Sequence, residues 1–173
     1  MHVPSTLNDV VITATAEIEG PCTAVVFTLT SPDGEKISPT SASVSTFKSG
    51  NGALAEARFE IADPKLWFPH GYGEQSLYRL DAVLGDRVDK VAKTLGIRRA
   101  RLVQRELEEQ DGLSFFFEIN NVPIFCGGSN WIPADSFIPR ISDDRYKEWL
   151  ELLAAGGHVM VRYLPQIPPP PPP

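Results

Sequence analysis

Residues 10–18 read Val-Val-Ile-Thr-Ala-Thr-Ala-Glu-Ile, and this stretch decides the fold class. Every second side chain is apolar, which is the period of a β-strand that buries one face. The apolar set is Val10, Ile12, Ala14, Ala16 and Ile18. The stretch therefore predicts a strand whose even-numbered side chains enter a core.

Similar stretches follow over the next 80 or so residues. Residues 23–30, 53–61, 77–84 and 88–95 each read as a short strand, and turn residues such as Ser31-Pro32-Asp33-Gly34 separate them. The Ser/Thr-rich stretch 36–47 fits one edge strand. Six or seven short strands in about 100 residues predict an antiparallel β-sandwich.

Composition excludes several classes of protein. The 173 residues are 42% hydrophobic and 22% charged, as expected for a globular chain, and the net charge of −6 argues against a nucleic-acid binder. No apolar run is long enough for a membrane span. The first residues lack the basic and apolar regions of a secretory signal, so we expect a cytoplasmic or otherwise intracellular protein. Cys22 and Cys126 cannot form a disulfide framework and are expected to be reduced core residues.

The pattern changes after a charged stretch at 105–112, which fits a linker. Residues 114–126 predict two strands around a turn at Asn120-Asn121, and the glycines and proline of 127–137 predict an irregular loop. A helix is expected next, with Ser142 as its N-cap and Gly156-Gly157 at its end. Its apolar stripe is Tyr146, Trp149, Leu150 and Leu153.

A short apolar strand at 158–164 follows this helix. A strand, a helix and a second strand form a βαβ unit, in which the two strands are parallel. One such unit leaves apolar faces that need further neighbours.

The loop at 63–78 contains Trp67 and Phe68, for which two interpretations stay open. The favoured one pins both aromatic rings in the core. The other makes them an exposed platform for a sugar. His70 is expected to be a solvated loop residue.

Five motifs resemble glycoside hydrolase family 2, and within it the fungal intracellular-type β-mannosidases. The resemblance covers roughly residues 60–162. The motifs are Leu66-Trp67-Phe68-Pro69, Gly71-Tyr72-Gly73-Glu74-Gln75-Ser76-Leu77-Tyr78, Thr94-Leu95-Gly96-Ile97-Arg98, Phe115-Phe116-Phe117-Glu118-Ile119-Asn120 and Gly127-Gly128-Ser129-Asn130-Trp131-Ile132-Pro133-Ala134-Asp135-Ser136-Phe137.

The resemblance implies a mainly β fold: an immunoglobulin-like antiparallel β-sandwich followed by a truncated first βαβ portion of a (β/α)₈ barrel. The expected divisions are residues 1–104 for the sandwich, 105–163 for the start of the barrel and 164–173 for a proline-rich, disordered tail. A complete barrel takes about 250 residues, so most of it, and the family's N-terminal jelly roll, would lie outside this chain.

The resemblance also implies a retaining hydrolase of carbohydrate metabolism that removes terminal β-D-mannose from oligosaccharides, with no cofactor and no metal. Its expected partner is the β-mannoside oligosaccharide, with no nucleic acid and no membrane. The family's acid/base and nucleophile glutamates have no counterpart here, so we expect the isolated chain to be inactive. A retaining glycosidase needs both carboxylates, about 5–5.5 Å apart.

Four residues are candidates for substrate binding: Asn130, Trp131, Asp135 and Arg162. Asp135 fits either a substrate contact or a loop-stabilising Asx hydrogen bond, and Trp131 fits either a sugar contact or packing between barrel and sandwich. Arg162 matches a family arginine that lies near the nucleophile, and the resemblance stops directly after it. Glu118 is expected on a solvated strand face.

The six prolines at 168–173 predict an extended polyproline II segment. It is either a recognition tail or a discontinuity in the sequence, and we favour the second, so we expect no protein partner for it. Two other functions also stay open: a non-catalytic sandwich that binds carbohydrate or a protein, and a structural remnant without activity.

Overall fold

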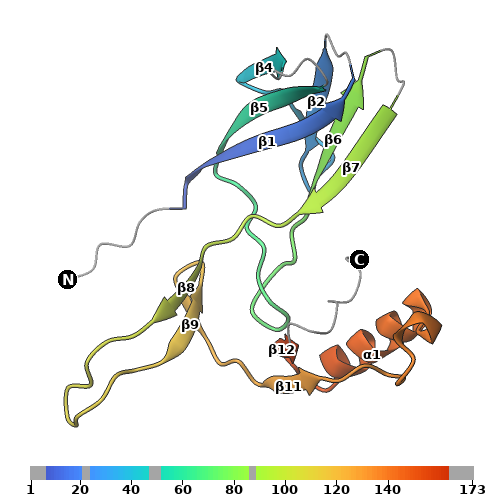
Figure 1. Cartoon of the computed structure of the whole chain (residues 1–173). Helices are drawn as coiled ribbons and strands as arrows, with labels where there is room; N and C mark the ends of the chain where they lie inside the picture. The colour runs from blue at the N-terminus through green and yellow to red at the C-terminus, as the bar shows by residue number, and fades with distance from the viewer. Residues whose placement is uncertain (1–6, 21–23, 47–51, 86–88, 164–173) are drawn as a thin grey trace. The chain divides into compact units, whose positions relative to one another are not determined.

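A computed structural model describes residues 7–20, 24–46, 52–85 and 89–163 (Figure 1). The chain divides into two compact units. The first unit is Met1–Trp67 with Gln75–Arg98, and the second is Phe68–Glu74 with Arg99–Pro173. Cys22 and the proline-rich tail lie outside the described residues.

Two antiparallel sheets form the first unit. One has the order β1-β5-β4 and the other β3-β2-β6-β7, so chain neighbours β1 and β2 lie in different sheets. This is the order of strands B-E-D and C′-C-F-G in an immunoglobulin sandwich. The bounds are β1 Asp9–Glu19, β2 Val25–Thr30, β3 Lys36–Ile37, β4 Ser41–Thr46, β5 Gly52–Ala62, β6 Tyr78–Leu84 and β7 Asp89–Leu95.

The core of this sandwich lies between the two sheets. Phe59 on β5 and Leu29 on β2 are 0% exposed, and Tyr78 at the start of β6 is 2% exposed. The Tyr78 hydroxyl accepts a 2.9 Å hydrogen bond from the Lys65 amide, which satisfies its polar end inside an apolar layer. Even-numbered residues of β1 face this core, so the strand predicted over 10–18 is confirmed.

The prediction of one edge strand at 36–47 is wrong. The structure has two strands there, and they belong to different sheets: β3 pairs with β2, and β4 pairs with β5. Pro39 interrupts the stretch because it has no amide hydrogen for a ladder. Directly after it, the Thr40 amide donates to the Arg58 carbonyl oxygen at 2.7 Å, which starts the pairing with β5.

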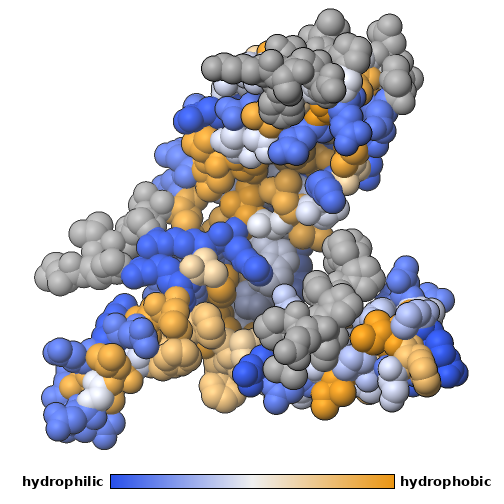
Figure 2. Space-filling view, in the orientation of Figure 1, coloured by the Kyte–Doolittle hydropathy of each residue, from blue (hydrophilic) through white to orange (hydrophobic). Residues whose placement is uncertain are grey.

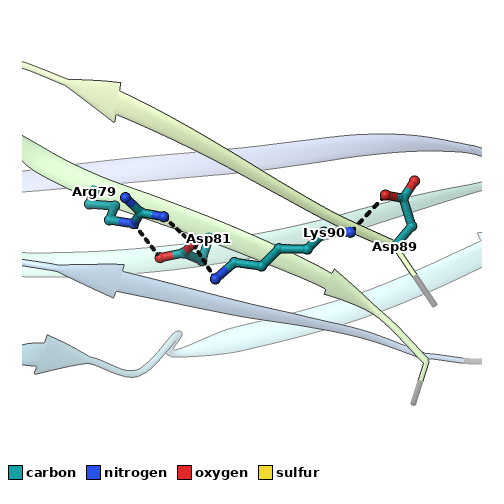
Figure 3. Close-up of polar contacts among 4 residues, drawn as sticks. All are labelled: Arg79, Asp81, Asp89 and Lys90. Atoms are coloured by element: carbon teal, nitrogen blue, oxygen red, sulfur yellow. Dashed lines mark hydrogen bonds and ion pairs between the residues drawn. The ribbon is translucent and has the colours of Figure 1, made fainter. Parts of the chain in front are cut away.

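Charged side chains form a network on the outer face of the second sheet (Figure 3). The Asp81 carboxylate on β6 accepts from the Arg79 guanidinium at 2.9 Å and lies 3.1 Å from the Lys90 ammonium of β7. Hydrogen bonds from Arg79, and then from Lys90, hold the pKa of Asp81 below its ordinary value. The same hydrogen bond raises the pKa of Arg79.

A three-stranded antiparallel sheet in the second unit contains β8 (Ala100–Val103), β9 (Phe116–Ile119) and β10 (Val122–Ile124). Asn120 and Asn121 have φ of 51° and 67°, the left-handed conformation that a two-residue hairpin turn requires. The predicted hairpin is therefore confirmed. Strand β8 pairs with β9 across the expected boundary at 104–105, and the domain limits stay a prediction.

Strand β11 (Gly128–Trp131) pairs in parallel with β12 (Met160–Tyr163), and helix α1 (Asp143–Ala155) connects them after the short 3₁₀ helix η1 (Ile138–Arg140). The Ser142 side chain accepts from the Arg145 amide, and Gly156 is the C-cap, as the sequence predicts. A parallel βαβ unit is therefore present, but its first strand is β11, inside the predicted loop, and not the predicted strand that ends at residue 126, which pairs antiparallel with β9.

The irregular loop expected over 127–137 is wrong in its first half, where β11 forms. Gly128 explains why a strand forms here and why the sequence nevertheless predicts a loop. A Cβ atom at this position would overlap the Met160 carbonyl oxygen, so only glycine allows β11 and β12 to approach. Two glycines in a row resemble a loop until the neighbouring strand is known.

The described chain is mainly β, as predicted. Cys126 is a free thiol and is half-buried, so it is not the core residue that we expected. No helix in the described part of the chain is long and apolar enough to cross a membrane.

Candidate functional site

Parallel pairing of β11 and β12 brings two of the four candidate residues together. Asn130 and Arg162 are register partners on the adjacent strands, and both are exposed. Side chains alternate along a strand, so this pair lies on one face and Ser129 and Trp131 lie on the other. Trp131 contacts helix α1, which means that Asn130 and Arg162 occupy the face away from the helix.

The Trp131 side chain is buried against α1. It is 4% exposed, its ring stacks on Tyr146 at a centroid distance of 5.9 Å, and it meets Trp149 edge-on at 6.2 Å. This is packing against the helix, and the packing between barrel and sandwich that we named as the alternative stays a prediction. Its indole Nε1 is buried and has no hydrogen-bond partner among the described residues. A contact between Trp131 and substrate stays a prediction.

Asp135 is tied into the loop that follows β11. Its Oδ1 atom accepts a 2.8 Å hydrogen bond from the Phe137 amide, which is the Asx arrangement that the sequence left open. The Arg140 Nε atom lies 3.8 Å from Oδ2. A surface hollow of about 360 Å³ adjoins this carboxylate, and its lining includes Arg140, Ser142 and Arg145.

Glu118 is more buried than the sequence predicts. We expected it on a solvated face, but its side chain is only 12% exposed and lies 3.6 Å from the Arg101 guanidinium of β8. The sequence gives no sign of this burial because the partner is on a strand that we did not predict.

The aromatic loop of the sandwich favours the packing interpretation. The Arg98 guanidinium lies 4.6 Å from the centre of the Trp67 ring, and the ring packs so closely on Gly96 that a Cβ there would approach Trp67 Cγ within 2.8 Å. Trp67 and Phe68 are half-buried, and His70 is exposed, as expected.

A polar contact that sequence reasoning missed links β11 to the segment before β12. The Ser129 hydroxyl and His158 Nε2 are 2.8 Å apart, and His158 Nδ1 is buried with no partner among the described residues. The two residues are 29 positions apart in the sequence, and only the parallel pairing of β11 and β12 brings them together, so no local pattern predicts the contact. Within the described ranges, no group of three His, Cys, Asp or Glu residues could hold a metal ion.

Comparisons with known proteins cover both units. The profile of Glycosyl hydrolases family 2 matches residues 6–98. Beta-mannosidase B of Thermothelomyces thermophilus is 48% identical over 133 residues, which are 75% of this chain and 15% of that protein. Beta-mannosidase B of Emericella nidulans is 40% identical over 169 residues, which are 94% of this chain and 19% of that protein.

A solved structure supports the same assignment. The crystal structure of β-D-mannosidase from Dictyoglomus thermophilum superposes with a TM-score of 0.71 and 35% identity, over 92% of this chain and 20% of that one. The chain thus spans about a fifth or less of the length of these relatives. Because the family profile matches more than half of the 173 residues, the chain belongs to glycosyl hydrolases family 2.

Proposed function

We propose that this chain is part of a β-mannosidase-like retaining glycoside hydrolase that removes terminal β-D-mannose from oligosaccharides. In this proposal residues 1–104 form the immunoglobulin-like domain and 105–163 begin the (β/α)₈ barrel. The observation that carries it is the β11-α1-β12 unit, because a family 2 sandwich is followed here by one parallel βαβ step. The names of the relatives supply the substrate class.

Within this proposal, Asn130 and Arg162 act on the substrate side. They are exposed, adjacent and on the face of β11 and β12 away from α1. An amide bonds sugar hydroxyls, and a guanidinium keeps a neighbouring carboxylate ionised. Trp131, whose contact with substrate stays a prediction, stacks on Tyr146 and in this proposal also sets the position of Asn130.

We also propose that a polypeptide of these 173 residues is catalytically inert. The retaining mechanism needs one carboxylate to attack the sugar and a second to protonate the leaving oxygen. Among the four candidate residues only Asp135 is a carboxylate, and its oxygens already contact the Phe137 amide and Arg140. Arg162 cannot act as the acid because its guanidinium keeps its protons.

Hydrolysis of an aryl β-mannoside tests both parts of the proposal. The purified 173-residue chain should release the aryl group no faster than buffer does. A chimera, in which this chain replaces the matching region of the Emericella nidulans relative, should hydrolyse the substrate. The Arg162→Ala chimera should lose most of that activity, whereas Arg79→Ala, which changes an exposed arginine of the sandwich, should leave it unchanged.

Three outcomes would contradict the proposal. If the 173-residue chain cleaves the substrate and Asp135→Asn abolishes cleavage, the inertness is wrong. If the chimera folds and stays inactive, the enzymatic part is wrong. Specific binding of glycans by such an inactive protein would favour a non-catalytic carbohydrate-binding module instead.

A further inference from the structure

The sheet of β8, β9 and β10 has one face that is apolar throughout and a second, mixed face that carries an ion pair. The register places Phe117 of β9 between Leu102 of β8 and Ile124 of β10, with all three side chains on the same face. One residue further along β9, Glu118 pairs with Arg101 on the opposite face. The alternation of strand side chains thus keeps charge off the first face, whereas Val103 and Phe116 share the second face with the ion pair.

Several side chains of the apolar face are exposed, although Ile124 on the same face is buried. Four apolar side chains are exposed: Phe115 by 68%, Leu102 by 46%, Val122 by 39% and Phe117 by 37%. We call these four residues the aromatic face. The Glu118 side chain on the other face is only 12% exposed. An antiparallel sheet normally buries its apolar face and solvates the other, so the aromatic face lacks a covering layer among the described residues of the second unit.

The chemistry of this face restricts what can cover it. Phe115 and Phe117 pack edge-on at 6.5 Å, and Figure 2 shows apolar colours gathered over β8 and β9. No charged side chain lies on this face of the three strands, because Arg101 and Glu118 both lie on the other. A charged peptide would lose hydration here without gaining an ionic partner. The occupant is therefore itself apolar, as in the interior of a protein or an obligate interface.

We propose that the aromatic face is where the rest of the catalytic domain packs, the occupant being an apolar surface of the polypeptide that the β-mannosidase relatives carry beyond the region matched here. This inference rests on the proposed function. Two observations support the choice of occupant. The relatives are at least five times as long as their matched region, and the second unit has only three buried apolar residues among those described.

Labelling of a cysteine placed on the face tests the inference. Phe117→Cys is made in the 173-residue chain and in the Emericella nidulans chimera, and alkylation at position 117 is followed by mass spectrometry of peptides. Val26→Cys is the matched control, because Val26 is an exposed strand residue of the sandwich. Position 117 should react at least tenfold more slowly in the chimera, whereas position 26 should react equally in both proteins. Leu102→Cys provides a second position on the face if Phe117→Cys does not fold.

Two results would overturn the inference. Equal labelling of position 117 in both proteins would mean that no further polypeptide covers it. Labelling of the 173-residue chain that slows as its concentration rises would show that a second copy is the occupant. Activity of the unaltered chimera separates this test from the proposed function, because protection without hydrolysis supports the docking and contradicts the enzyme, and hydrolysis without protection does the reverse.

Discussion

The two units of this chain differ in how they bury their apolar residues. Among the described residues, the first unit contains ten of the thirteen buried hydrophobic residues, and the second contains Val103, Ile124 and Trp131. Exposed large hydrophobic side chains are distributed the other way, with four in the first unit and thirteen in the second. The sandwich closes a core of its own, whereas the second unit consists of elements whose apolar sides need more neighbours.

The largest effect is expected from Phe59→Ala in the sandwich. Phe59 is 0% exposed, so its truncation should lower the free energy of unfolding by about 3–5 kcal/mol. The same substitution at Phe115, which is 68% exposed, should cost less than about 1 kcal/mol. Urea unfolding followed by circular dichroism measures both.

Hydrogen exchange in the Phe59→Ala protein sharpens the comparison. If the units have separate stabilities, amides of β5 should exchange faster while those of α1 keep their rates. Equal acceleration in β5 and α1 would show one cooperative unit and contradict the division.

Gly128→Ala should come next in size. The added Cβ overlaps the Met160 carbonyl oxygen, so β11 and β12 must separate, at a cost of about 1–3 kcal/mol. Exchange of the amides in β12 should accelerate, and exchange in β5 should not change. Gly127→Ala is the control, because its Cβ would meet only the exposed ring of Phe125, at 3.3 Å. Similar exchange in the two variants would refute the close approach of the strands.

Ser142→Ala removes the N-cap of α1. Its hydroxyl accepts from the Arg145 amide at 3.3 Å, and loss of such a cap costs about 1 kcal/mol. Exchange at the first turn of α1 should rise about fivefold, which is that free energy expressed as a ratio of rates. Ser136→Ala, in an exposed loop position, should have no effect. An unchanged helix in the Ser142 variant would argue that packing on Trp131 alone holds it.

The smallest effect concerns Asp81. Its pKa in the folded protein lies below its unfolded value, so its contribution to stability is present above the ordinary aspartate pKa of about 3.9 and is lost as pH falls through the lower folded value. In Asp81→Asn, urea midpoints should therefore fall less between neutral pH and pH 3. Added salt should reduce the difference between the two proteins, because Arg79 and Lys90 are exposed by more than half. If the urea midpoints of the original protein and of Asp81→Asn change with pH in parallel, the ion pairs of Asp81 contribute nothing to stability.

Local sequence patterns were sufficient for most strands of the sandwich and for α1, but not for β3 and β4. The alternation in β1 and β5 and the cap at Ser142 are signals within a few residues, and each was confirmed. The pairing of β11 with β12 was different, because the need for glycine at position 128 arises from a strand 32 positions further along the chain.

The same limit applies to the candidate site. Asn130 and Arg162 were named from the sequence, but that they are neighbours depends on the parallel register. The burial of Glu118 depends on Arg101, and the position of Trp131 depends on Tyr146, so neither could be read from its own segment. Contacts between segments decide which polar groups are buried, and a single sequence does not give those contacts.

The edge-on contact of Trp131 with Trp149 has an optical consequence. These are two of the chain's three tryptophans, and the third, Trp67, belongs to the other unit. Two indoles at 6.2 Å couple their electronic transitions, which gives a signal in the ultraviolet circular dichroism that a lone indole lacks. Trp67 lies beside the Arg98 guanidinium in the first unit and is outside this pair. The coupled signal of Trp131 and Trp149 therefore follows the unfolding of the second unit without any attached label.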